Sequence, residues 1–301
     1  MIGSLGTFLI NWLVFSALYA LIAIGFTIIF GVGGVLNLAH GASITMSAFL
    51  TLYLFPDVAG SMPDLAALLV VLAVTLVVVG LFNGVLYLVL VRGLERVYET
   101  AEQVALLVMI VTLLAALIVE ETITLEFGTR ARSVPNFASG VLPGTNVQMN
   151  LIVGFVVSWV ALGVIYLFVT RTKIGKALVA ASMSRKGAQI VGVDIRRLYL
   201  FTWILAGSLA AISGVFLGSF QGATPVMGRN PLIISFAIVI IGGLGSIRGS
   251  VLGAYIIGFF EVGTTTFISP SYTGISAFIA IVVMLLVRPE GLFGRELQVG
   301  E

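Results

Sequence analysis

The sequence predicts an all-α protein that crosses a membrane about nine times, with some of its helices broken. Hydrophobic residues make up 59% of the 301 and charged residues only 9%, whereas soluble domains carry about 25% charged residues. The mean hydropathy is +1.18. No charged side chain precedes Asp57, so the first part of the chain has to lie in the membrane. No stretch would form a soluble domain, and residues 1–301 are expected to form one transmembrane domain.

The apolar segments have the lengths that membrane helices need. A full span takes about 20 apolar residues, and the halves of a broken helix are shorter. An N-terminal signal peptide would carry a basic region ahead of its apolar run, and the first thirty residues contain no Lys or Arg. We therefore expect this stretch to be retained. We expect nine spans, with eight or ten as alternatives, near residues 8–30, 42–55, 64–91, 103–121, 149–169, 198–219, 231–245, 249–268 and 273–287.

Positive charge sets the orientation. Segment 171–197 holds seven of the fifteen Lys and Arg residues and a single acid, Asp194. Basic residues in short loops stay on the cytoplasmic side. Counting spans from this segment places the C-terminus in the cytoplasm. The chain is thus predicted to be a multi-pass protein of the cell membrane, embedded in the lipid bilayer, with the basic loops and the C-terminus inside.

The same segment is also patterned as a helix. Ile174, Ala177, Leu178 and Ala181 follow the i, i+3, i+4, i+7 spacing of an amphipathic helix, and Gly187 permits a break. An apolar stripe on a segment that stays in water needs a partner surface. The residues expected to contact that partner are Ile174, Gly175, Ala177, Leu178, Ala181, Gly187 and Gly192.

Two glycine-rich interruptions stand at similar positions of the two halves, within residues 26–41 and 236–249. Non-helical backbone within the membrane is tolerated only where protein or a water-filled cavity supplies hydrogen bonds to its N–H and C=O groups. Paired interruptions therefore indicate a transport site, and they also indicate a possible internal two-fold repeat. The alternatives are a helix cap for the first and a tight helix contact for the second. The residues expected to line a substrate pathway are Asn37, His40, Gly41, Ser43, Gly242, Gly243, Gly245 and Ser246.

Glu261 is a lone acid in an apolar span, which makes it a functional candidate by default. It would either contact an ammonium group in the pathway or be neutral and hydrogen-bonded to a neighbouring helix, and the second reading is favoured. Glu120 and Glu121 are expected to end a span in solvent.

The sequence argues against an enzyme. Without cysteine there is no disulfide framework or thiolate site. The single histidine, His40, excludes an HExxH zinc site, and neither a GxSxG elbow nor a GxxxxGK[ST] phosphate loop occurs. We expect no metal and no cofactor in this chain. The net charge of +2 reflects membrane orientation and gives no reason to expect nucleic-acid binding.

Four ordered motifs together resemble the LivH/LivM-type permeases of branched-chain amino acid ABC importers. They are FGVGGVLNLAHGASITMSAFL (30–50), RTKIGKALVAASMSRKGAQIVGVDIRR (171–197), IIGGLGSIRGSVLGAYIIGFFE (240–261) and LLVRPEGLFG (285–294). The resemblance covers nearly the whole chain. It implies a transport subunit that moves amino acids by alternating access.

The resemblance also implies partners. These are a second permease, homologous or identical, two cytoplasmic ATPases that bind ATP and Mg, and an extracytoplasmic substrate-binding protein, with 171–197 as the coupling segment docked on an ATPase. Two alternatives stay open: a permease for urea or short amides, and a stand-alone secondary transporter or channel. The second would leave the helical pattern within 171–197 unexplained.

Overall fold

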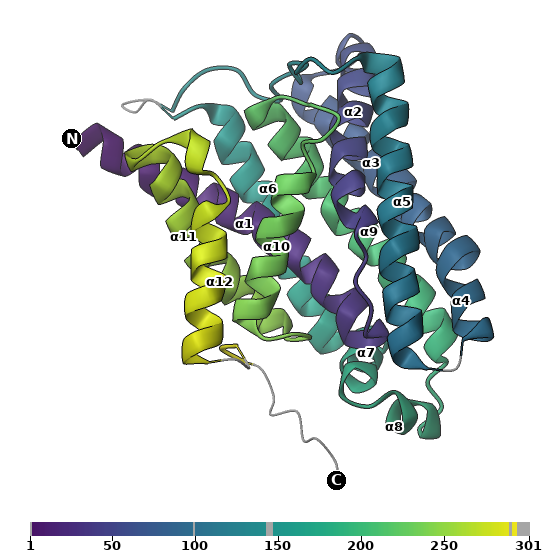
Figure 1. Ribbon diagram of the computed structural model, residues 1–301. Coiled ribbons are helices and arrows are strands. Elements are labelled where there is room, and N and C mark those ends of the chain that lie inside the picture. The colour runs from purple at the N-terminus through teal and green to yellow at the C-terminus, as the bar shows by residue number, and fades with distance from the viewer. Residues whose placement is uncertain (1, 99, 143–146, 289–290, 294–301) are drawn as a thin grey trace.

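A computed structural model describes residues 2–98, 100–142, 147–288 and 291–293. Across these residues the chain is a bundle of helices (Figure 1), and its only β structure is two isolated bridges, Arg132 with Ala223 and Val141 with Gln148. The prediction of an all-α membrane protein is confirmed.

Each of the nine predicted segments corresponds to an apolar helix in the described part of the chain. Seven stretches are long enough to cross a membrane and two helices are shorter. The long stretches are α1 (Ile2–Gly33), α2 (Ala39–Ala59), α3 (Asp64–Leu86) continued by η1 (Tyr87–Val91) and α4 (Arg92–Val97), α5 (Ala101–Phe127), α6 (Met149–Arg171), α9 (Ile195–Gln221) and α11 (Ile247–Phe267). The short ones are α10 (Arg229–Gly242) and α12 (Ile275–Val287). Three further short helices lie in loops: α7 (Lys173–Met183), α8 (Arg185–Ile190) and η2 (Pro270–Tyr272).

Three of the differences between the predicted and the observed helix ends affect candidate site residues. α2 begins at Ala39, so His40 and Gly41 lie in its first turn and not in the break. α5 continues to Phe127, which leaves Glu120 two turns from its end. α10 stops at Gly242 because Gly243 and Gly245 have φ angles of 95° and 85°, a backbone region that glycine adopts without strain.

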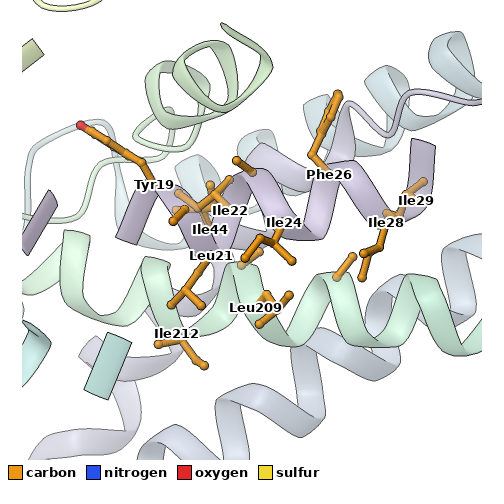
Figure 2. Packing of buried hydrophobic residues seen from close by; sticks show 14 of the residues in the cluster. Tyr19, Leu21, Ile22, Ile24, Phe26, Ile28, Ile29, Ile44, Leu209 and Ile212 are labelled. Atoms are coloured by element: carbon orange, nitrogen blue, oxygen red, sulfur yellow. The ribbon is translucent and has the colours of Figure 1, made fainter. Parts of the chain in front are cut away.

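The core of the bundle is formed by α1 and α9. In the most apolar 18-residue stretch of each helix, 83% of the residues of α1 and 72% of those of α9 are buried. The corresponding share is 17% for both α5 and α6, which lie at the periphery. Figure 2 shows Leu21 and Ile24 of α1 directed toward Leu209 and Ile212 of α9. The packing between these helices is therefore apolar and leaves little room for a solvent path through the centre of the chain.

The loops predicted to be cytoplasmic gather at one end of the bundle, the end with α7 and α8 in Figure 1. A methyl group added to Gly31, near the end of α1, would lie 3.3 Å from Cβ of Ser182 and 3.5 Å from Cα of Gly245. The Arg185 Nε donates a hydrogen bond to the Val32 carbonyl at 2.5 Å. The end defined by residues 171–197 is called the basic end below.

Candidate functional site

The break between α1 and α2 is held by buried polar side chains. Asn37 Nδ2 donates to Asn83 Oδ1 at 3.3 Å, and Asn83 Nδ2 donates to Ser43 Oγ at 2.9 Å. Asn37 Oδ1 accepts the Ala39 amide at 3.0 Å, so Asn37 also closes the first turn of α2. All three side chains are buried. The non-helical segment at residues 34–38 is thereby tied to both α2 and α3.

His40 lies in the same region, and one of its two ring nitrogens is hydrogen-bonded. Its Nε2 is 3.1 Å from the Ile22 carbonyl of α1, while Nδ1 has no hydrogen-bond partner among the described residues. The ring packs against Gly25, where an added methyl group would lie 2.9 Å from Cε1. Gly41, the next residue, faces Gly228: a methyl group there would be 2.9 Å from the Gly228 carbonyl oxygen. This glycine pair lets α2 approach the start of α10.

The second interruption is a tight turn at the basic end. Gly242 and Gly249 are in backbone contact across the turn, which admits no side chain at either position. Ser246 Oγ accepts the Gly249 amide at 3.1 Å and caps α11. The segment after α12 adds two hydrogen bonds, from the Leu292 amide to the Ile241 carbonyl and from the Phe293 amide to the Gly242 carbonyl. The unpaired carbonyls at the end of α10 are satisfied in this way.

Glu261 is buried and hydrogen-bonded to a neighbouring helix. Its two oxygens accept the Gly274 amide at 2.8 Å and the Ser276 hydroxyl at 2.6 Å, both at the start of α12. A carboxylate beside a helix N-terminus satisfies amides that would otherwise lack acceptors. The hydrogen bonding that was the favoured reading is present, and Glu261 ties α11 to α12.

The predicted pathway residues thus lie in three places: the break between α1 and α2, the turn between α10 and α11, and the start of α12. The first two are connected through the last turn of α1, whose Gly31 contacts Gly245. That these residues border one pathway stays a prediction.

The segment 171–197 folds as two helices with two different faces. Gly175, Leu178 and Ala181 are buried, and Gly175 fits against the backbone of Phe168 and Val169 of α6. Part of the predicted apolar stripe is therefore covered by the chain itself. On the other side Ile174, Val179 and Met183 are exposed, and Ile190 and Val191 reach 85% and 76% exposure.

Two hollows flank these helices. A groove of about 230 Å³ between α7 and α8 is lined mainly by apolar atoms of Ala180, Met183, Ala188 and Val191. A cavity of about 550 Å³ lies between α4, α8 and α9, and its charged lining residues are Glu95, Arg185, Asp194 and Arg196. The basic end therefore presents an apolar groove beside a charged hollow.

The sequence reading missed an ion pair inside the membrane segments. Arg229 Nε lies 3.1 Å from both carboxylate oxygens of Glu120, and Nη2 donates to Oε2. The Glu120 side chain is 10% exposed and that of Arg229 58%. The one signal in the sequence was Arg229, which stands directly before an apolar segment. Its partner Glu120 is 109 positions away, so local sequence patterns do not connect the two residues.

Together these features define an integral, multi-pass membrane protein with two interrupted helices and a structured basic loop. Its sequence identifies the family: residues 8–288 match the one described as branched-chain amino acid transport system / permease component, and the chain belongs to it.

Two relatives named as branched-chain amino acid transport permeases agree with this assignment. The chain is 26% identical to the high-affinity branched-chain amino acid transport system permease protein LivH of Salmonella typhimurium, covering 95% of this chain and 94% of the relative. It is 32% identical to a probable branched-chain amino acid transport permease protein LivH of Methanocaldococcus jannaschii, with 94% and 90% covered. The ribose import permease protein RbsC of Haemophilus influenzae is 26% identical, with 96% and 86% covered. A solved structure, PsaBC from Streptococcus pneumoniae in complex with Fab, aligns over 95% of this chain and 94% of its own with a TM-score of 0.48 at 12% identity.

Proposed function

We propose that this chain is the membrane subunit of an ATP-driven importer that moves branched-chain or related amino acids by alternating access. In this proposal it pairs with a second permease, receives substrate from an extracytoplasmic binding protein and is driven by two cytoplasmic ATPases that hold ATP and Mg. The basic end and the C-terminus face the cytoplasm. The observation that carries the proposal is the segment 171–197, which forms ordered helices with exposed apolar side chains in a chain without a nucleotide-binding motif.

Each helix of this segment would have a distinct part in coupling. The buried residues Gly175, Leu178 and Ala181 anchor α7 to the bundle. The groove between α7 and α8, where Gly187 lies beside Ser184, would contact the ATPase together with Ile174 and Ala177 of α7. Gly192 has a φ of 89° and turns the chain toward α9.

The contacts of this segment give a route from the ATPase to the broken helices. Arg185 of α8 is bonded to the Val32 carbonyl, one residue before the end of α1. Ser182 of α7 and Gly245 of the α10–α11 turn meet at Gly31. A displacement of α7 and α8 would thus move the end of α1 and the neighbouring turn together.

The proposed pathway elements are those that such a movement would shift. They are the break with Asn37, His40, Gly41 and Ser43, the turn with Gly242, Gly243, Gly245 and Ser246, and Glu261 as the link between α11 and α12. Side chains that are buried in this conformation would become accessible in another.

The test is uptake of radiolabelled leucine and, separately, urea by proteoliposomes that contain the permease pair, with and without the ATPases and the binding protein. We expect ATP-dependent leucine uptake that needs every component. Leucine uptake by the permease alone would support a stand-alone transporter, and urea uptake in place of leucine would support the amide branch.

A further inference from the structure

The Glu120–Arg229 pair joins the first residue of α10 to α5, two turns before the end of α5. The Gly228 amide donates to Thr45 Oγ1 of α2 at 3.0 Å. Thirteen residues of α10 separate Arg229 from Gly242, and seven of α5 separate Glu120 from Phe127. At 1.5 Å rise per residue, the pair lies about 20 Å from the end of α10 at Gly242 and about 10 Å from the end of α5 at Phe127.

This depth restricts what can cover the arginine. The Arg229 side chain is 58% exposed, and an exposed guanidinium in hydrocarbon is strongly unfavourable. The flank of α10 that carries Arg229 must therefore face water or protein. In Figure 1, α10 and α5 stand on either side of the segment that joins α1 to α2, which is the first predicted interruption.

The hydrogen bonds leave part of the guanidinium available. A guanidinium has five N–H donors arranged so that two of its edges can each hold a carboxylate. Glu120 occupies the edge formed by Nε and Nη2. No acceptor for Nη1 is present among the described residues, so a second edge is open. The N-terminal end of α10 adds positive potential at the same place.

Two exposed apolar side chains lie close to Arg229 along the chain. Ile233 lies one turn along α10 and is 37% exposed, and Val226 in the preceding turn is 46% exposed. The Arg229 amide donates to the Val226 carbonyl, which places that turn directly before the arginine. A ligand whose carboxylate binds Arg229 could thus place an apolar group against Val226 or Ile233.

We propose that the open edge of Arg229 is an intramembrane binding point for the carboxylate of an amino acid with an apolar side chain, and that Glu120 is the positioning residue that holds the guanidinium. This rests on the proposed function and narrows it, since urea and neutral amides have no carboxylate to offer. Bidentate binding of a carboxylate by arginine gives both charge compensation and fixed geometry.

The test uses the complete transporter in proteoliposomes and an Arg229→Cys variant, because the chain has no native cysteine. We expect leucine uptake to fall at least tenfold while ATP hydrolysis stimulated by leucine-loaded binding protein stays within twofold of wild type. Modification with aminoethyl methanethiosulfonate, which attaches an ammonium group, should restore several-fold uptake. The sulfonatoethyl reagent, which attaches an anion, should restore none. Treated wild-type transporter controls for thiols in the partners, and Arg130→Gln, an exposed arginine in the loop after α5, should transport normally.

Wild-type uptake by the Arg229→Cys variant, or equal rescue by both reagents, would overturn the inference. If the cysteine variant does not assemble, Arg229→Lys decides the question. Lysine can pair with Glu120 but cannot hold two carboxylates on separate edges. We therefore expect the Arg229→Lys transporter to assemble normally and to lose several-fold in leucine uptake. Full uptake would mean that the Glu120–Arg229 pair is only structural. Urea uptake by wild type in place of leucine would overturn the proposed function and the carboxylate assignment with it.

Discussion

Single polar residues at membrane depth determine how the broken part of this protein is held. Asn83 bonds Asn37 and Ser43 and also donates to the Val79 carbonyl of its own helix at 2.9 Å. Gly207 of α9 lies directly against its amide, so the side chain is fixed from two sides. Asn83 therefore connects three helices to one non-helical segment.

Replacing Asn83 with alanine should destabilise the purified permease by about 1–3 kcal/mol, because the buried Asn37 Nδ2 loses its acceptor and the Ser43 hydroxyl, which still donates to the Ala39 carbonyl, loses its donor. The measurement is a thermal unfolding curve in detergent. Thr122→Ala is the matched control, since Thr122 is exposed and its hydroxyl bonds only the Ile118 carbonyl of its own helix. Equal shifts for the two variants would show that the Asn83 contacts contribute little.

At the scale of elements, α7 shows that helical periodicity locates an apolar stripe without saying what covers it. Leu178 and Ala181 were expected to meet a partner, and they pack inside the chain, where each is 3% exposed or less. The side chains left open, Ile190 and Val191 above all, lie in and after α8. The buried face of α7 therefore holds the segment against the bundle, and the exposed side chains in and after α8 are the ones we expect to contact the ATPase.

An aspartate should have different effects on the buried face of α7 and on the exposed face of α8. Leu178→Asp puts a charge into the anchored face, so we expect loss of folded permease, with a cost of several kcal/mol. Ile190→Asp should leave the permease folded and reduce co-purification of the ATPase at least fivefold. Ile268→Asp, at the opposite end of the bundle and 71% exposed, is the matched control and should affect neither readout. Wild-type recovery of the ATPase with Ile190→Asp would exclude this face.

The turn between α10 and α11 depends on the absence of side chains. A valine at Gly242 would overlap the Gly249 backbone, so Gly242→Val should lower stability by about 1–3 kcal/mol and reduce transport. Gly163→Val in α6 is the control, since an added methyl group at Gly163 meets nothing within 4 Å. Both variants can be compared by size-exclusion chromatography and by leucine uptake.

At the scale of the whole molecule, local pattern predicted the elements and missed the long-range pairs. The nine apolar segments were predictable because each helix carries its own hydropathy signal. Glu120 was predicted to be a solvated helix end because the apolar segment was expected to stop at residue 121. Its partner Arg229 begins α10, with four helices, α6 to α9, between them in the chain. Glu261 was recognisable as a lone acid, but its partners at the start of α12 became clear only from the fold.

Alternating access predicts that accessibility at the two interruptions changes together. Cysteines placed singly at Asn37, His40 and Gly243 should react slowly with a membrane-impermeant thiol reagent when the site is closed, since Asn37 and His40 are buried. Trapping the transporter with ATP should change the rate at all three positions. Uniformly low reactivity in every state would indicate that these residues only pack.

The hydrogen bonds of residues 291–293 also set an order of assembly. The carbonyls of Ile241 and Gly242 receive their donors from Leu292 and Phe293, about fifty residues later in the chain. During synthesis α10 can enter the membrane early, but the carbonyls at its C-terminal end lack these two donors until residue 293 has been made and α12 has been inserted. Residues 291–293 would thus complete the fold late in biogenesis: a chain cut before Gly291 should insert all its spans and still be removed by quality-control proteases, because the carbonyls of Ile241 and Gly242 have lost their partners.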